Sequence, residues 1–300
     1  MCRLAGVARS TYYAWRARLQ RPTDWTRKPS TGRPRRGYVW TEAGDKVAEG
    51  QVLEWLTTYV LDPEGHAYGY RKLTTWLRRE HGLRINKKTV YRILREADLV
   101  QGQPLRPAHC RPERAIAVNR MVTAPNQLWE VDLKYGYSVG ADRFFYLCSV
   151  IDVFDRSIVG YHLGTQCTAR QALGALQGAV RERQADWGGT PPAIRSDNGP
   201  QFIARAWAEG CQALGVHHER IPNATPNKNA HIESWHSLLE AECWRNQVFD
   251  TIVDGYTVTV DWIQHYNTRR MHGSLQDWAP AQFYAWWQAG TAPPIKAVRC

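Results

Sequence analysis

The spacing of apolar positions changes along the 300-residue chain. Before residue 120, apolar side chains recur every three or four positions, which predicts helices. After that point, short alternating or continuous apolar runs predict strands at 127–135, 143–151, 157–163, 193–196 and 216–221. Helices are expected at 168–184, for about fifteen residues after Pro200, from Asn229 onward and at 252–266. This order predicts an α/β core at 123–246, with a mixed sheet flanked by helices. A C-terminal helical extension at 247–300 follows it.

The region 45–105 has the pattern of a small helical domain. A first helix, 45–59, is followed by 70–81, which has an apolar face and ends at Gly82. Asn86 can cap a further helix whose inward positions are Val90, Ile93 and Leu94. Two short helices around a turn with glycine favour a helix-turn-helix over a plain helical hairpin. The cations expected on the outer face of its second helix, available for DNA, are Lys87, Lys88, Arg92 and Arg95.

A shorter pattern of the same kind lies at residues 1–20. The segment 7–16 predicts a recognition helix capped by Ser10, with Arg9 and Arg16 able to reach a DNA groove. Only about six residues precede it, so we expect part of a helix-turn-helix, completed by another chain or present as a fragment. Residues 21–44 and 106–122 are rich in proline and basic residues without an apolar period, and are predicted to be linkers.

The charge of the chain is divided unequally. Residues 1–120 contain 24 Lys and Arg against 11 Asp and Glu, whereas residues 121–300 contain 15 against 17. A run of charge is often only a solvated face. Here the excess coincides with the predicted helix-turn-helix patterns, and a polyanion neutralised there would release counterions. We therefore expect double-stranded DNA to be a partner of the N-terminal part.

Composition excludes several classes of protein. No apolar run approaches the ~18 residues of a membrane span, and the N-terminus lacks the apolar block of a signal peptide. We therefore expect no membrane association and a cytoplasmic location. The seven cysteines are an odd, scattered set and contain no C-x-x-C motif, which argues against a disulfide framework. Cys211, His217 and His218 are interpreted as packing and surface groups rather than metal ligands.

Three acidic residues carry the candidate chemistry. Asp197 directly follows the predicted buried strand 193–196, and Glu233 lies in the first turns of the amphipathic helix that starts near Asn229. Asp132 lies in the middle of a strand, where a carboxylate has no structural reason to be. Thirty-five residues separate Asp197 from Glu233. Asp152 and Asp155 also follow a strand, but they are interpreted as turn residues.

Carboxylates that converge repel one another unless a cation neutralises them. Oxygen ligands with open positions suit Mg²⁺ or Mn²⁺. Two such ions, ~3.5–4 Å apart, activate a nucleophilic oxygen and stabilise the leaving oxygen of a phosphodiester. Asp132, Asp197 and Glu233 are therefore predicted to be both catalytic residues and ligands of Mg²⁺ or Mn²⁺, with two ions expected.

The segments LWEVDLKY, SDNGPQF and NAHIESWHSLLEAE resemble the three motifs of insertion-sequence transposases whose core is similar to that of retroviral integrases. The gap of 35 residues matches that family too. The resemblance implies a ribonuclease-H-like core and a DNA transposase that cleaves strands and transfers them. Retroviral integrases carry an N-terminal zinc site, and nothing in this sequence matches it, so we expect no zinc.

The resemblance extends to both sides of the core. GYRKLTTWLRREHGLRINKKTVYRILREADL is similar to the family's helix-turn-helix ahead of the core, and YNTRRMHGSLQDWAPAQFYAWW to its C-terminal signature. It also implies a homo-oligomer on DNA and a DNA-binding partner from an upstream reading frame. In the C-terminal segment, DNA contact by Arg269, Arg270 and His272 stays open. The aromatic residues of the tail are expected to pack it on the core: Trp278, Phe283, Trp286 and Trp287.

Two positions depart from the family pattern. Lys228 stands where an Asp is common, and Glu240 stands where a Lys or Arg is common. Lys228 is therefore kept as a candidate DNA contact. Glu240 lies seven residues after Glu233, about 10 Å along a helix, which is too far for one coordination sphere. The alternatives to a transposase are a catalytically inactive DNA-binding relative and a metal-dependent nuclease.

Overall fold

The computed structural model describes residues 37–62, 65, 67–100, 120–221, 229–245 and 247–300. The predicted N-terminal helix-turn-helix with Arg9 and Arg16, the loop 222–228 with Lys228, and most of both predicted linkers lie outside these residues. Within the described ranges, none of the helices is long and apolar enough to cross a membrane.

The N-terminal described region contains three helices and a small sheet. The helices are α2 (Glu49–Leu61), α3 (Tyr70–Glu80) and α4 (Lys87–Glu96). Strands β1 (Tyr38–Thr41), β2 (Lys46–Ala48) and β3 (Leu83–Arg84) form a sheet in the order β2-β1-β3. The predicted caps are present: Gly82 has φ +56° after α3, and Asn86 Oδ1 accepts a hydrogen bond from Lys88 N at 2.9 Å. Buried side chains join the three helices, among them Val52, Leu56, Leu73, Leu77, Val90, Ile93 and Leu94.

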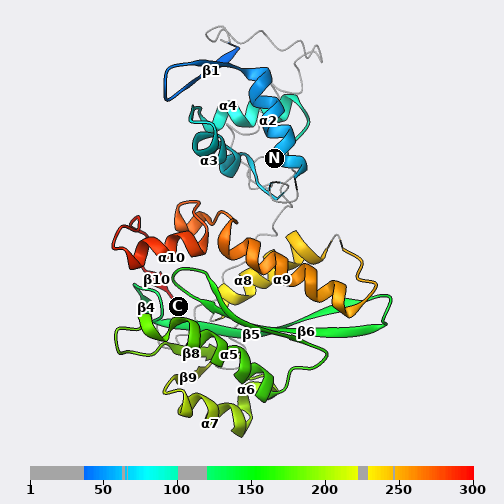
Figure 1. The fold of residues 1–300 in the computed structure, drawn as a ribbon, viewed down its shortest axis with the longest axis vertical. Helices are drawn as coiled ribbons and strands as arrows, with labels where there is room; N and C mark the ends of the chain where they lie inside the picture. The colour runs from blue at the N-terminus through cyan, green and yellow to red at the C-terminus, as the bar shows by residue number, and fades with distance from the viewer. Residues whose placement is uncertain (1–36, 63–64, 66, 101–119, 222–228, 246) are drawn as a thin grey trace, which may run out of the picture. The chain divides into compact units, whose positions relative to one another are not determined.

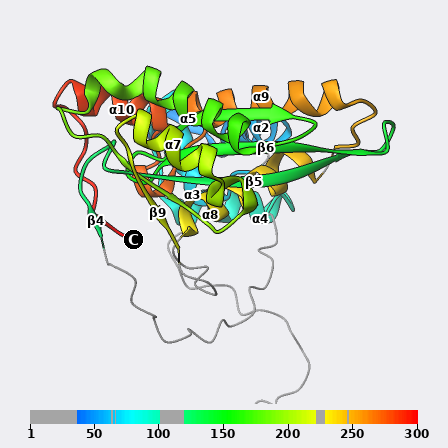
Figure 2. The ribbon, with the colours of Figure 1, turned by 90° about the horizontal axis from the view of Figure 1, so that it is seen from below.

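The core is built on a five-stranded sheet with the order β7-β6-β5-β8-β9 (Figure 1). Its strands are β5 (Leu128–Ser138), β6 (Arg143–Asp152), β7 (Ile158–Gly164), β8 (Ala193–Ser196) and β9 (His217–Arg220). The first three pair antiparallel, whereas β5 with β8 and β8 with β9 pair parallel. The long hairpin of β5 and β6 can be followed across the core in the view from below (Figure 2). The predicted mixed sheet is confirmed.

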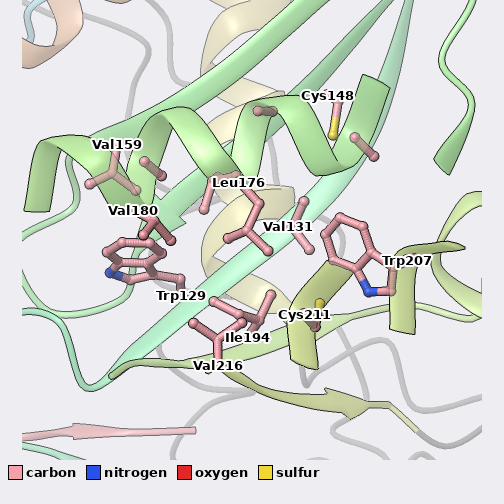
Figure 3. Packing of buried hydrophobic residues seen from close by; sticks show 14 of the residues in the cluster. Trp129, Val131, Cys148, Val159, Leu176, Val180, Ile194, Trp207, Cys211 and Val216 are labelled. Atoms are coloured by element: carbon pink, nitrogen blue, oxygen red, sulfur yellow. The ribbon is translucent and has the colours of Figure 1, made fainter. Parts of the chain in front are cut away.

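Helices cover both faces of this sheet (Figure 1). On one side lie α5 (Ala169–Arg183), the 3₁₀ turn η1 (Gln184–Asp186), α6 (Pro200–Ile203) and α7 (Arg205–Ala213). Figure 3 shows Trp129 and Val131 of β5 gathered with Leu176 and Val180 of α5 in the apolar layer on this side. On the other side lie α8 (Ala230–Leu239), its π-helical continuation η3 (Glu240–Trp244) and α9 (Ile252–Thr268).

The C-terminal extension contains η4 (Gly273–Leu275), α10 (Pro280–Gln288) and β10 (Val298–Arg299). Strand β10 pairs antiparallel with β4 (Met121–Val122). Phe283 is fully buried beside Phe154, with ring centroids 6.1 Å apart, and Trp287 also packs on Phe154, at 5.1 Å. Trp278 and Trp286 pack on each other at 4.4 Å. The predicted packing of the tail on the core is therefore confirmed for Phe283 and Trp287.

The elements differ from the predictions in several places. The helix predicted at 45–59 begins only at Glu49, because β2 occupies its first residues, and β10 lies in the extension predicted to be helical. Strands β1 and β4 lie inside segments predicted to be linkers, because each is only a few residues long and is stabilised by a partner distant in sequence. The helix expected after Pro200 is two helices, broken at Ala204, whose ψ is 143°. In one continuous helix Phe202 and Trp207 would point about 140° apart; the break lets both enter the same core, with ring centroids 5.1 Å apart.

Candidate active site

Sheet register brings the first two candidate carboxylates together. Strands β5 and β8 are parallel, and Val131 pairs with Ser196. Asp132 and Asp197 are the next residues along the two strands, which lie about 4.8 Å apart in any sheet. The Asp197 carboxylate accepts a hydrogen bond from Gly199 N at 2.9 Å, which orients it at the end of β8. The tertiary fold thus places side by side two acids that are 65 positions apart in the chain.

A polar stripe on β5 faces α8. Residues at alternate strand positions share a face, and Glu130, Asp132 and Lys134 do so here. Their partners follow one another along the helix: Glu130 Oε1 lies 3.0 Å from His231 Nδ1, Asp132 Oδ2 lies 3.6 Å from His236 Nδ1, and Lys134 Nζ lies 3.1 Å from Glu240. Two strand residues advance about 6.7 Å, and the four or five helical residues between successive partners advance about 6–7.5 Å, so strand and helix stay in step.

Glu130 holds the start of α8. Its Oε2 accepts hydrogen bonds from the backbone N–H groups of His231, at 3.0 Å, and Ile232, at 2.9 Å. These are among the N–H groups that a helix leaves unsatisfied at its N-terminus, and the N-cap residue Asn229 supplies no side-chain bond there. The fully buried carboxylate of Glu130 replaces that cap. Glu233, in the same first turn, is thereby positioned relative to β5.

The electrostatics of the site favour a bound cation. The pKa of Asp132 is raised to about 7, chiefly by burial and also by the negative charges of Asp197 and Glu233, although the hydrogen bond from Leu133 N acts in the opposite direction. The pKa of Glu233 is also raised, by burial first and by Glu130 second. His236 does not neutralise Asp132, because burial lowers its pKa to about 3 and leaves it uncharged.

The donor set fits a hard divalent cation. It consists of carboxylate oxygens. Two polar atoms close to Asp132 are buried without a hydrogen-bond partner among the described residues: Ser149 Oγ, opposite Asp132 in the β5–β6 register, and His236 Nε2. In the described part of the chain, no three His, Cys, Asp or Glu side chains lie at metal-ligand spacing. A shared ion therefore requires side-chain rotation, for which the exposed Glu233 has the freedom.

Sequence reasoning overlooked Glu130 and His236. Both signals are present in the chain: Glu130 is an acid at a buried strand position two residues before Asp132, and His236 falls on the buried face of α8. Neither function follows from spacing alone, because each depends on which helix covers β5.

The predicted DNA-binding cations of α4 divide into two groups. Lys87, Lys88 and Arg95 are exposed, and no ion pair forms between them and any described residue. Arg92 is different: its guanidinium pairs with Glu49 at 2.5 Å and with Glu96 at 3.1 Å. Arg92 was predicted to lie on the outer face as a DNA contact; its pair with Glu49 ties α4 to α2.

In the C-terminal segment, two of the possible DNA contacts are internal. Arg270 is buried and binds both oxygens of Glu242, at 2.5 and 2.6 Å. His272 lies 2.9 Å from the Tyr266 hydroxyl, and burial keeps its pKa well below the ordinary value. Their sequence neighbours are basic, but these two side chains point into the fold because each has a polar partner there.

The remaining acids and thiols have structural roles. Asp152 and Asp155 are fully buried in the β6–β7 turn, as expected of turn residues. Asp152 accepts from Asn126 N and Trp129 Nε1, and Asp155 pairs with Arg183 at 2.9 Å. Among the predicted packing and surface groups, Cys211 is buried, His217 is exposed and His218 lies 2.8 Å from Ser196 Oγ.

Comparisons with known families agree with this architecture. The family model described as "Integrase core domain" matches residues 122–226, and a second one with the same description matches 214–280. An "HTH-like domain" model matches residues 61–107. Together these matches cover the helical region with α3 and α4 and the core, whose sheet and helix α8 carry the three acids.

Several curated proteins are similar over most of the chain. An uncharacterized 39.2 kDa protein of insertion element IS476 from Xanthomonas euvesicatoria is 32% identical over 76% of this chain, and the match spans 64% of that relative, less than two thirds of its length. An uncharacterized 31.7 kDa protein of insertion element IS407 from Burkholderia multivorans is 30% identical over 74% of this chain and 77% of its own. The transposase for IS629 from Shigella sonnei is 28% identical, with 79% and 81% covered.

Solved structures match the chain at low identity. A chain in the simian T-cell lymphotropic virus intasome is 16% identical, with 82% of this chain and 78% of that chain covered and a TM-score of 0.46.

Proposed function

Because the chain belongs to the insertion-sequence transposases with an integrase core domain, we propose that it cleaves DNA strands at the ends of an insertion sequence and transfers them to target DNA. Asp132, Asp197 and Glu233 are the proposed catalytic carboxylates. The observation that supports this most is the β5–β8 register, which sets Asp132 beside Asp197 while Glu130 holds the helix of Glu233 against the same strand.

The same three carboxylates are proposed to hold Mg²⁺ or Mn²⁺, two ions in all. Such ions would supply an activated nucleophilic oxygen and stabilisation of the leaving oxygen of the phosphodiester. The protein's own contribution is to orient the ligands: Gly199 N fixes Asp197, Leu133 N fixes Asp132 at 2.7 Å, and the buried Glu130 fixes the first turn of α8. The raised pKa of Asp132 favours any arrangement in which a cation offsets its neighbours' charge.

DNA binding by α4 is the second part of the proposal. Lys87 and Lys88 occupy the first turn of the helix, where the positive end of the helix dipole disfavours cations, and no acidic residue balances them in that turn. A duplex phosphate at this end would be attracted by both lysines and by the backbone N–H groups. Two element ends have to be cut and joined, so we also propose that copies of this chain assemble on DNA.

The test is a cleavage and joining assay with labelled duplexes that carry the element ends, in the presence of Mg²⁺ or Mn²⁺. Asp132→Asn, Asp197→Asn and Glu233→Gln are each expected to lower both reactions by at least ~10³-fold, because each removes a negatively charged ligand on which transition-state stabilisation depends. Glu182→Gln, on exposed α5 surface, is the matched control and should retain activity. Affinity for DNA in EDTA should be unchanged in all four.

Near wild-type strand transfer by any two of the three active-site variants would refute the assignment. Protein that binds the ends but never cleaves them with either metal would favour the inactive regulatory relative. Cleavage of any duplex without joining would favour a metal-dependent nuclease.

A further inference from the structure

A pocket of about 510 Å³ lies at the β6–β7 turn, away from the three carboxylates. The turn contributes Phe154 and Arg156, the segment after α9 contributes Ser274 and Gln276, and the C-terminal tail contributes the wall 294–298. Gln276 Nε2 donates a hydrogen bond to Pro294 O at 2.8 Å, which ties the tail to the opposite wall. The pocket is therefore formed by three separate segments of the chain.

Arg156 occupies a backbone position that suits glycine. Its φ is +67°, in the left-handed region, and its N–H donates to Asp152 O at 3.0 Å to close the turn. Glycine adopts this conformation without steric cost, whereas a long side chain does so at a cost in free energy. Residues held in such a conformation cluster at functional sites, so Arg156 is a candidate for a role beyond the turn.

The guanidinium of Arg156 has no partner among the described residues. It forms neither a hydrogen bond nor an ion pair there, although it is partly buried and burial is the main cause of its lowered pKa. By contrast, the buried Arg183, Arg195 and Arg270 each bind a carboxylate. Asp152 and Glu130 act on Arg156 only through their charge, because backbone N–H groups and other side chains occupy their oxygens.

An unpaired guanidinium in an open pocket is suited to an anion with several oxygens, because its N–H groups match carboxylate and phosphate geometry. Lys296, exposed on the tail, adds a second positive charge at the same pocket, and Ser274 adds a hydroxyl. Apolar side chains such as Ile295 and Val298 also line it, which suits a sugar next to a phosphate.

The turn that carries Arg156 is bonded to the layer that holds α8. The Tyr266 hydroxyl donates to Arg156 O at 3.1 Å, and Tyr266 belongs to the apolar layer that packs α8 and α9 on the sheet. The charge of Glu130 raises the pKa of Arg156, and Glu130 is also the carboxylate that holds the first turn of α8. An anion bound by Arg156 would therefore lie near the helix start that carries Glu233.

We propose that this pocket binds a backbone phosphate of DNA through Arg156, with Lys296 and Ser274 as supporting contacts. The proposal rests on the function inferred above, since it takes the anion from the DNA substrate. The core would then contact DNA in addition to the surface of α4. A phosphate contact of this kind fixes the position of the duplex and does not read its sequence.

The test measures binding of an element-end duplex to the full chain in EDTA, where no cleavage occurs, between about 50 and 200 mM salt. Arg156→Met is expected to lower the slope of log affinity against log salt by ~0.9 and to weaken binding about tenfold at the lowest salt, as expected when one phosphate is no longer neutralised. Arg156→Lys keeps the charge and should retain the slope. Lys296→Met should give a smaller loss in the same direction, and Arg181→Met, on exposed α5 surface, should match wild type.

Wild-type slopes for both Arg156→Met and Lys296→Met would overturn the proposal, as would an equal loss in Arg181→Met. Lys296 is exposed, so its variant keeps the test valid if Arg156→Met folds poorly. Inorganic phosphate is titrated in parallel: a melting temperature that phosphate raises in wild type but not in Arg156→Met, with unchanged DNA slopes, would assign the pocket to free phosphate and refute the DNA site. Because no cleavage is measured, an inactive protein with an Arg156-dependent slope would count against the transposase mechanism alone.

Discussion

Arginine and lysine serve different purposes in the helical region and in the core. On α4, Lys87, Lys88 and Arg95 point to solvent without an ion-pair partner in the described structure. In the core, buried arginines pair with acids: Arg183 with Asp155, Arg195 with Glu219 and Arg270 with Glu242, at 2.9, 2.7 and 2.5 Å. These three cations of α4 are therefore available to a polyanion, whereas the three core arginines hold the fold together.

The buried cation Arg270 of the core should be needed for stability. Arg270→Met leaves the buried Glu242 carboxylate without its partner, and breaking a buried pair in this way costs ~3–5 kcal/mol. Urea denaturation should show this loss. Arg95→Met on α4 should change the free energy of unfolding by less than ~0.5 kcal/mol. A similar, small change in both variants would mean that the buried pair contributes no more than a surface charge.

The exposed cations of the helical region should instead contribute to DNA binding. Replacing Lys87, Lys88 and Arg95 together with Gln should reduce the salt slope of duplex binding by up to ~2.7, that is ~0.9 for each phosphate that is no longer neutralised, with little change in the melting temperature. Fluorescence anisotropy over a salt series measures it.

Arg92→Gln provides the internal control for that series, because Glu49 and Glu96 already neutralise Arg92. We expect a slope close to wild type and a modest loss of stability. The triple variant gives an average change in salt slope for each cation removed. If Arg92→Gln changed the slope by that same amount, ion pairing within the fold would not decide which cations contact DNA.

The acids of the core should also make its stability depend on pH near neutrality. The pKa of Asp132 is about 7 in the folded protein and near 3.8 when unfolded, so the folded state binds more protons between these values. Stability of the metal-free protein should therefore fall as pH rises from about 4 to 7, by up to about 1.4 kcal/mol per pH unit. Asp132→Asn should lose this component when urea denaturation in EDTA is compared at pH 5 and pH 8. If the free energy of unfolding changed with pH in the same way in both proteins, the raised pKa of Asp132 would be contradicted.

The smallest effect is expected at Glu240, which shares the helical face of Glu233 but pairs with Lys134 at 3.1 Å. Glu240→Ala breaks a partly exposed ion pair, so strand transfer should fall less than tenfold. A loss as complete as that of Glu233→Gln, in a variant that still folds and binds DNA, would give Glu240 a catalytic role.

Local patterns predicted much of this structure because their causes are local. Asn86 caps α4 and Gly82 ends the turn after α3 through bonds and φ angles within a few residues. The apolar alternation of β5 follows from one face packing under α5, as Trp129 and Val131 do. Short strands such as β4 were missed, because two residues become a strand only when β10, at the far end of the chain, pairs with them.

The sequence alone determined the class of the fold, the three candidate acids and the excess of positive charge before residue 120, because periodicity, motif spacing and composition are properties of the chain. Only the tertiary structure decided which charges are free. Arg92, Arg270 and Lys87 look alike in sequence, yet two are neutralised and one is exposed. It also showed that Glu130 holds the helix of Glu233 and that Arg156 lines a pocket without a partner among the described residues. The physical reason is that an ion pair or a hydrogen bond acts over only a few ångströms, and the groups that approach so closely come from segments far apart in the chain.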